Sequence, residues 1–382
     1  MASISKRNGM WQYRVSYKDG GKYRNKTKGG FSTKREAQIA AAVIENLVGR
    51  GAKLKAGDQI FTDYFQWWYE TYRKGKKSPE NDRDVERAIK FAKKMFNGMA
   101  IKDIDKGTYQ NALNIYAKNH STSSVRKHHI YMRACFREAI EEDIIFKDPT
   151  FNAVTIGKVK EKKESLKYIN YSDELRLVAE IVKDLRPRYI SRYIILFGLA
   201  TGCRFSEILG MTWDCINFKK HTARVNKTWD YQDTNDFGDT KNDASMRVIS
   251  IDGKTCEILE QLKAAQTNKA VETGLRNIHN LCFVNDKMEL VSNNAVNKCL
   301  KSLCAKLGIQ EITCHSLRHT HASMLLYKGI NIKYISRRLG HKSIITTLDT
   351  YSHIIDELQQ VGNEQTMAAL NSLYFSRKIG AK

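Results

Sequence analysis

The chain has 382 residues, and its 64 lysines and arginines exceed its 41 aspartates and glutamates to give a formal net charge of +23. With 42% hydrophobic residues and three prolines, the composition predicts two or three folded domains and argues against extended disorder. No run of 18 apolar residues and no amino-terminal apolar block occurs, so a membrane span and secretion are disfavoured.

The cysteines and the charge indicate the compartment and the class of partner. Eight cysteines are scattered without a C-x-x-C pair, which argues against a disulfide framework and a structural zinc site and favours a cytoplasmic location. A large positive surplus favours a polyanionic partner, because each phosphate contacted releases counterions. Nucleic acid is therefore the leading candidate.

The first 57 residues predict a small DNA-binding module, since they hold 13 basic and three acidic residues. Apolar and polar side chains alternate from Trp11 to Tyr17, which predicts a half-buried strand. Asp19-Gly20-Gly21 predicts a turn into a second strand at 22–27. Thr33 and Glu36 have the spacing of a capping box, which opens a helix that we expect to reach Val48.

A hairpin of this kind is narrow enough to enter a DNA groove. The basic residues that we expect to contact DNA from it are Arg14, Lys18, Arg24, Lys26 and Lys28. The alternative is a solvated basic face with no partner.

Residues 58–155 predict an all-helical domain. Aromatic residues recur at helical spacing, as expected for a core face: Phe61, Tyr64, Phe65, Trp68 and Tyr72. Further helices are predicted over 82–96, 106–118 and 124–142. The last of these carries basic residues suited to phosphate contacts, with a solvated surface as the alternative: Arg126, Lys127, Arg133 and Arg137.

The remaining chain divides into a linker at 156–168, which is rich in lysine, and a large domain at 169–382. In the large domain, Ser172 is expected to start a helix, and residues 192–199 predict a strongly apolar one. A β-rich interval is predicted at 216–251, followed by helices as far as residue 375. The predicted fold class is mainly α with small β elements.

Polar residues are dense in four short segments of this domain. These segments are Arg204-Phe205-Ser206-Glu207, His315-Ser316-Leu317-Arg318, Leu339-Gly340-His341 and Thr350-Tyr351-Ser352. In this order they resemble the catalytic signatures of the tyrosine recombinase (lambda-type phage integrase) family. The domain order also resembles integrases of phages and of integrative and conjugative elements, which have an amino-terminal arm-binding domain and a helical core-binding domain.

The resemblance implies a role for each matched residue. Arg204 and Arg318 correspond to the two catalytic arginines, and Tyr351 corresponds to the nucleophile. The other matched positions are Glu207, which steadies the site, His315 of the H-x-x-R motif, His341 of the L-G-H motif, and Lys241 as the lysine of the β-hairpin, for which Lys227 is the alternative.

Phosphodiester chemistry requires residues of these types. Two arginines can bind the nonbridging oxygens bidentately and stabilise the charge of the transition state. A tyrosine needs a base to lose its proton, and His315 is the candidate, while Lys241 could protonate the departing 5′-hydroxyl. The resemblance implies a 3′-phosphotyrosine intermediate and no cofactor, neither ATP nor metal. It further implies a homotetramer that acts on core-type and arm-type sites of double-stranded DNA. An excisionase and a host DNA-bending factor are possible partners.

Several other interpretations of the same residues stay open. His315, His319 and His321 could bind zinc in a metal-dependent nuclease, although no H-E-x-x-H motif is present. A recombinase-like protein without catalysis, a type IB topoisomerase and a Xer-like resolvase are further alternatives. Met367, Leu370 and Tyr374 predict an apolar stripe on a final helix, which could pack on its own domain or on a neighbouring protomer.

Overall fold

The computed structural model describes residues 2–19, 22–49, 56–160, 168–231, 233–240, 243–352, 354, 366–367 and 370–371. The chain forms two compact units, 1–161 and 162–382, which are described separately. The finer boundaries at residues 57 and 155 stay a prediction. Among the helices that the structure describes, none combines the length and the apolar character needed to cross a bilayer.

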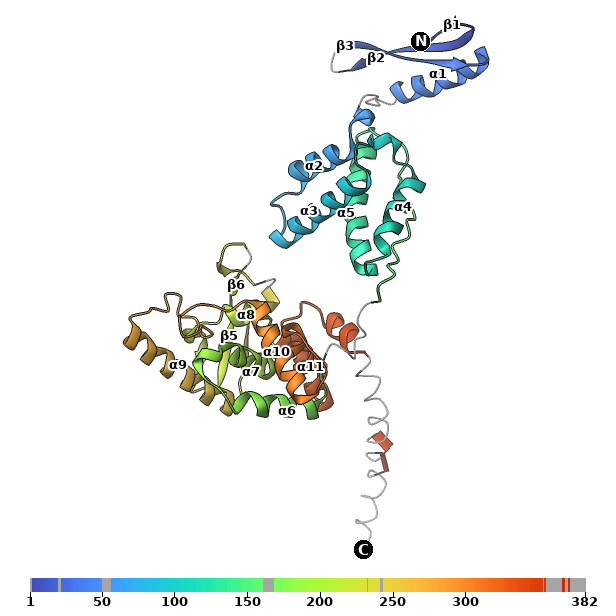
Figure 1. Ribbon diagram of the computed structural model, residues 1–382. Helices are drawn as coiled ribbons and strands as arrows, with labels where there is room; N and C mark the ends of the chain where they lie inside the picture. Colours follow the sequence, from blue (N-terminus) through green and yellow to red (C-terminus); the bar gives the residue numbers. More distant parts are fainter. Residues whose placement is uncertain are drawn as a thin grey trace. The chain divides into compact units, whose positions relative to one another are not determined.

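The amino-terminal part of the first unit is a three-stranded antiparallel sheet with one helix packed along it (Figure 1). Its elements are β1 (Ser3–Arg7), β2 (Met10–Asp19), β3 (Lys22–Phe31) and α1 (Lys34–Gly49). The predicted capping box is confirmed, because Glu36 N–H donates to Thr33 Oγ1 at 3.2 Å and the Glu36 carboxylate accepts from Thr33 N–H at 3.2 Å. Strand β1 was not predicted, since its short polar sequence has no apolar alternation.

The strand register divides the basic residues of β2 and β3 between the two faces of this sheet. Tyr13, Val15 and Tyr17 are buried against α1, and directly opposite residues of an antiparallel pair project to the same face. The pairs on this helix-covered face are Tyr13 with Lys28, Val15 with Lys26, and Tyr17 with Arg24. Arg14 and Lys18 alternate with the buried residues and lie exposed on the open face.

The rest of the first unit is a bundle of four helices (Figure 1). They are α2 (Phe61–Tyr72), α3 (Pro79–Met95), α4 (Lys106–Ala117) and α5 (Thr122–Glu141), with 3-10 turns at Ala56–Asp58 and Ile101–Asp103. The predicted aromatic core is confirmed for α2, where Phe61 is fully buried and stacks on Phe136 at 4.4 Å between ring centroids. Helix α3 begins before the predicted residue 82, because Ser78 caps it and Pro79 is preorganised for its first position.

The segment after this bundle is held against the corner between α4 and α5. The Gln110 side chain makes two hydrogen bonds with the backbone of Val154, at 2.8 and 3.0 Å. A Cβ on Gly157 would lie 2.3 Å from the carbonyl oxygen of His120, so only glycine permits this approach. These contacts fix the backbone of residues 154–157 against α4 and the turn that precedes α5.

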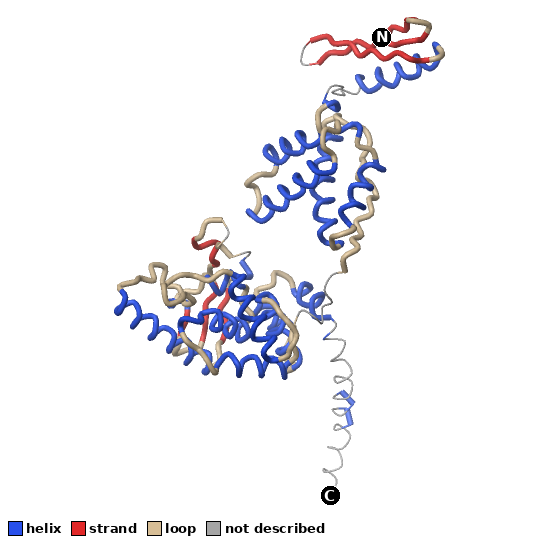
Figure 2. Tube along the Cα trace, in the orientation of Figure 1, coloured by secondary structure: helices blue, strands red, loops and turns tan. Residues whose placement is uncertain are grey.

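The second unit is mainly helical and encloses two small sheets (Figure 2). Its helices are α6 (Tyr171–Val182), α7 (Ile190–Thr201), α8 (Phe205–Leu209), α9 (Gly253–Thr273), α10 (Asn293–Leu307), α11 (Cys314–Tyr327) and α12 (Ile332–Leu339), with 3-10 turns at Pro187–Tyr189, Trp213–Cys215 and Asp243–Ser245. The sheets are β4 (Ile216–Asn217), β5 (Thr222–Val225) and β8 (Arg247–Ser250), and the hairpin β6 (Thr228–Asp230) with β7 (Asp236–Gly238).

Helix α7 is the central element of this unit, as its apolar sequence predicted. All of its positions from 193 to 199 are buried. Helix α6 begins at Tyr171 rather than at the predicted Ser172, because the Asn170 side chain accepts the Asp173 N–H at 2.8 Å and caps the helix. A further helical segment covers residues 344–352, and in the tail Met367 and Leu370 are exposed whereas Tyr374 lies outside the described residues.

Candidate active site

The candidate site begins at the turn between α7 and α8. Gly202 ends α7 with a φ of +68°, and a Cβ there would lie 2.7 Å from the imidazole of His321 and 2.8 Å from the side chain of Leu339. Only glycine satisfies both the left-handed conformation and the close packing. The turn places Arg204 immediately before the first residue of α8.

Arg204 and Arg247 share one buried carboxylate. Glu207 Oε1 accepts from Arg204 at 2.8 Å, and Arg247 donates to both carboxylate oxygens at 2.9 and 3.2 Å. Burial alone would raise the pKa of Glu207, but the hydrogen bonds and charges of Arg247 and Arg204 hold it below its ordinary value. Glu207 is therefore ionised, and it fixes Arg204 against strand β8.

Arg318 joins two turns of the chain. Its Nη1 donates to the carbonyl oxygen of Gly202 at 2.8 Å, and its Nη2 donates to that of Leu339 at 2.6 Å. The side chain is buried, and this burial together with the charge of Arg204 lowers its pKa to about 10. Arg318 stays protonated at neutral pH, and these two bonds use two of its five N–H donors.

Arg338, like Arg318, donates hydrogen bonds to backbone carbonyls of separate chain segments. It donates to the carbonyl oxygens of Ala200 and Ser250 at 3.1 and 3.0 Å, and its Nε lies 2.9 Å from His321 Nε2. Because an arginine only donates, His321 Nε2 must accept, so Nδ1 carries the proton that it donates to the carbonyl of Leu199 at 2.7 Å. Burial and the charge of Arg338 lower the pKa of His321 to about 3, so this imidazole is neutral.

His341 follows the turn at the end of α12. Its Nδ1 lies 2.7 Å from the hydroxyl of Thr347, and burial followed by the charges of Arg318 and Arg204 lowers its pKa to about 4. The ring is therefore neutral at physiological pH. In the tautomer in which Nδ1 accepts from Thr347, Nε2 carries a proton that can be donated to a phosphate oxygen.

Tyr351 lies in the helical segment after His341, and its side chain is buried. Its hydroxyl lies 3.2 Å from Nδ1 of His319, and the ring of His319 meets that of His315 edge to face at 5.2 Å between centroids. The charge of Tyr351 acts on Arg318, so the phenol and the two arginines belong to one electrostatic cluster.

The structure thus brings together most of the residues that the motifs predicted. Arg204, Glu207, Arg318, His341 and Tyr351 meet from four separate segments of the second unit. Lys241 lies outside the described residues. Lys227, the alternative, lies 4.6 Å from the ring centroid of Phe237 in the β6–β7 hairpin.

Three contributors to the site were not predicted from sequence. Arg247 and Arg338 contact it from β8 and α12, and His319 contacts the phenol. Their sequence signals are modest, since Arg247 stands in the predicted β-rich interval and His319 follows His315 by one helical turn.

The basic residues predicted to contact DNA from α5 have different surroundings. Arg126 and Arg137 are exposed, and Lys127 is also exposed but pairs with Asp84 at 3.0 Å. Arg133 is half-buried, and its charge helps to lower the pKa of His129 after burial.

The histidines proposed as a zinc site have other partners. Both ring nitrogens of His321 are occupied by Leu199 and Arg338, and Nδ1 of His319 lies against Tyr351. In the part of the chain that the structure describes, no group of three potential ligands is arranged to hold a metal ion.

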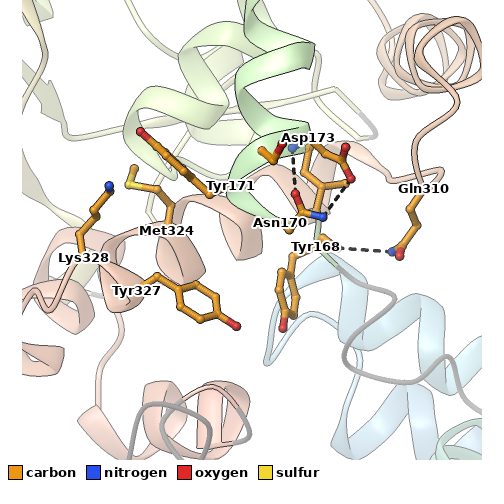
Figure 3. A pocket seen from close by; sticks show the side chains of 10 residues that line it. Tyr168, Asn170, Tyr171, Asp173, Gln310, Met324, Tyr327 and Lys328 are labelled. Carbon is orange, nitrogen blue, oxygen red and sulfur yellow. Dashed lines mark hydrogen bonds between the residues drawn. The ribbon is translucent and has the colours of Figure 1, made fainter. Parts of the chain in front are cut away.

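A separate cavity of about 600 Å³ lies at the start of α6 (Figure 3). Tyr168, Tyr171 and Tyr327 contribute aromatic side chains to it, and the ammonium group of Lys328 lies 4.4 Å from the ring centroid of Tyr171. None of the residues of the candidate site lines this cavity, so it is distinct from the arginine and tyrosine cluster.

Residues 169–357 match the phage integrase family, and residues 3–47 match a family of arm DNA-binding domains. A XerC-like tyrosine recombinase of Caldanaerobacter subterraneus subsp. tengcongensis is 25% identical over 378 residues, which cover 91% of this chain and 94% of the relative. The ICEBs1 integrase of Bacillus subtilis (strain 168) is 28% identical over 243 residues, which cover 63% of this chain and 64% of that integrase.

Two solved structures share the fold of this chain. The Tn1549 transposon integrase in complex with transposon right end DNA has a TM-score of 0.66 at 16% identity, and the similarity covers 80% of this chain and 100% of that chain. The lambda integrase tetramer bound to a Holliday junction has a TM-score of 0.56 at 18% identity, with coverage of 89% and 95%.

Proposed function

The chain belongs to the phage integrase family of tyrosine recombinases, which break and rejoin DNA, and we propose that it is the integrase of a prophage or of an integrative and conjugative element. The observation that carries the proposal is the cluster in which Arg204, Arg318 and His341 lie within electrostatic reach of one another, with Arg318 also within reach of the buried Tyr351. The arm-domain match and the similarity to the ICEBs1 integrase support a mobile element.

In the proposed reaction, Arg204 and Arg318 bind the nonbridging oxygens of the scissile phosphate. Both guanidinium groups are fixed by buried partners, so their charges need little reorganisation as negative charge develops. The Tyr351 oxygen forms a bond to phosphorus while the bond to the 5′-oxygen breaks, which leaves a 3′-phosphotyrosine and a 5′-hydroxyl. Lys241, assigned by resemblance, protonates that 5′-oxygen, and His341 donates to the phosphate.

The same proposal divides the chain into an arm-binding domain at 1–57, a core-binding domain at 58–155, a linker at 156–168 and a catalytic domain at 169–382. The open face of the arm sheet, with Arg14 and Lys18, is the surface proposed to enter the groove of arm-type DNA. Arg24, Lys26 and Lys28, which share the helix-covered face, would contact the phosphates beside it.

Strand exchange between two DNA sites needs two cleavages at each site, which is the basis for proposing four protomers. The lambda integrase, of similar fold, is a tetramer on a Holliday junction. An excisionase and a host DNA-bending factor are included as proposed partners on the resemblance to the family alone.

A Xer-like resolvase is the second candidate, because a XerC-like recombinase matches 91% of this chain. The two candidates differ in their use of arm-type DNA. An integrase should bind a second class of site through residues 1–57, whereas a resolvase should recombine two core sites equally well when these residues are removed.

The first experiment incubates the full chain, in EDTA, with a nicked suicide substrate that carries the core site read from the junctions of its element. Wild type should form a protein–DNA adduct that survives denaturing electrophoresis, and Tyr351→Phe should form none. Cleavage of the DNA that occurs only in a parallel reaction without EDTA would indicate a metal-dependent nuclease. Tight DNA binding without any adduct would instead favour a noncatalytic DNA-binding protein.

A further inference from the structure

We propose that His319 accepts the proton of the Tyr351 hydroxyl as that hydroxyl attacks the scissile phosphate. The inference deepens the proposed function and rests on it, since it assigns the base of the cleavage step. The H-x-x-R motif by itself favoured His315 for this role.

The geometry places His319 next to the reacting oxygen. Its Nδ1 lies 3.2 Å from the Tyr351 hydroxyl, within reach for direct proton transfer. The two rings are 5.8 Å apart between centroids and inclined at 57°, so the nitrogen rather than the ring face meets the hydroxyl.

His315 and His319 differ in their exposure, although they stand one turn apart on α11. His315 is exposed at the surface, and its ring touches His319 at 5.2 Å between centroids. His319 is half-buried between His315 and the buried phenol of Tyr351. This order leaves His315 open to solvent, where it can contact a bound phosphate, and leaves His319 next to the nucleophile.

The buried position of Tyr351 makes a nearby base necessary. A free phenol has a pKa of about 10, and burial disfavours the phenolate further. Imidazole is the side-chain base that exchanges a proton most readily near neutral pH, so its chemistry suits this role. Among the residues that the structure describes, titratable groups that act on or contact His319 include His315, Tyr351 and His341. The pKa of His341 is lowered in part by His319.

The step balances in atoms and charge. The Tyr351 O–H bond breaks, its proton joins Nδ1 of His319, and the phenolic oxygen forms the bond to phosphorus. The bond from phosphorus to the 5′-oxygen breaks, and that oxygen takes a proton from the general acid, assigned above to Lys241. Rejoining runs the same steps in reverse, so the imidazolium returns its proton to the phenolic oxygen.

The test compares His319→Ala, His319→Asn and His315→Ala as full chains on the nicked suicide substrate, with and without added imidazole. Removal of a general base lowers rates by about 10²–10⁴-fold, so His319→Ala should form the adduct slower by that factor. Added imidazole should raise the rate of adduct formation by His319→Ala at least about tenfold, because it supplies a base in the space that the side chain leaves. His319→Asn keeps a hydrogen-bond acceptor for the phenol but no titratable base, so it should stay as slow as the alanine variant.

Controls separate this inference from the proposed function. Tyr351→Phe should stay inactive with imidazole, and the free energy of unfolding of each variant should remain close to that of wild type. An Asn variant with wild-type rates would reduce His319 to a positioning residue and overturn the inference. Imidazole rescue of His315→Ala but not of His319→Ala would assign the base to His315 instead. If wild type itself forms no adduct, the proposed function fails and this inference fails with it.

Discussion

The buried ion pair between Arg247 and Glu207 gives the most quantitative prediction. The Glu207 side chain is 1% exposed and that of Arg247 is 7% exposed. Arg247→Met leaves the carboxylate with Arg204 as its remaining guanidinium partner at 2.8 Å. Breaking a buried pair costs about 3–5 kcal/mol, and because Arg204 remains we expect a loss of about 3 kcal/mol in the free energy of unfolding. This corresponds to a fall in Tm of about 6–12 °C for a unit of this size.

The pH dependence of this loss has a defined sign. In the wild-type chain the pKa of Glu207 is lowered, because Arg247 and Arg204 outweigh burial. Its stabilising contribution is present above the pKa of the unfolded chain and is lost as the pH falls through the lower, folded pKa. In Arg247→Met the carboxylate loses the strongest of the interactions that lower its pKa, so its pKa rises relative to wild type and protonation of the variant costs less. The difference in the free energy of unfolding between variant and wild type should therefore shrink on acidification, as the pH falls through the range in which the carboxylate takes up a proton.

Urea unfolding of the full chain, followed by tryptophan fluorescence, measures this difference. The matched control is Glu257→Gln, which removes an exposed pair with Lys254 at 2.7 Å and should change the free energy of unfolding by less than about 0.5 kcal/mol. A loss below about 1 kcal/mol for Arg247→Met, or a loss that grows on acidification, would refute the reasoning.

Three further predictions concern the α7–α8 turn, the arm sheet and the tail. Gly202→Ala should lower the free energy of unfolding by about 2–3 kcal/mol and reduce adduct formation, because the added Cβ would lie 2.7 Å from the imidazole of His321. The control is Gly274→Ala, which has a similar φ of +72° but open space around it, so it should lower the free energy of unfolding by only about 1 kcal/mol. Equal losses in the two variants would contradict the packing argument. Arg14→Ala should weaken binding to arm-type DNA in fluorescence anisotropy by about 1–3 kcal/mol and relax its sequence preference, with core-site binding unchanged, and an unchanged affinity for arm-type DNA would contradict the groove contact. Deletion of residues 364–382 should distinguish the two packing alternatives for the tail. If the tail packs on a neighbouring protomer, Tm should stay unchanged and recombination of paired sites should fall, whereas a lowered Tm would indicate that the tail packs on its own domain.

Much of the fold follows from local sequence patterns. The helical spacing of Phe61, Tyr64 and Phe65 predicted the core face of α2, and the apolar run at 192–199 predicted the buried α7. The capping box at Thr33 set the start of α1. These features depend on periodicity and on hydrogen bonds within a few residues, so the sequence contains them directly. Strand β1 escaped prediction because its stability comes from pairing with β2 rather than from its own pattern.

The order of the motifs predicted the chemistry of the candidate site, because two arginines, a tyrosine and histidines in that order resemble the signature of a family that attacks phosphodiesters. The contacts that orient these groups were decided by the tertiary structure. Arg318 reaches Gly202 across 116 residues of sequence, and His321 reaches Leu199 across 122. No local pattern specifies such pairs, since they depend on how α7, α11 and α12 pack together. The same packing, and not the H-x-x-R motif, brings Nδ1 of His319 to 3.2 Å from the Tyr351 hydroxyl.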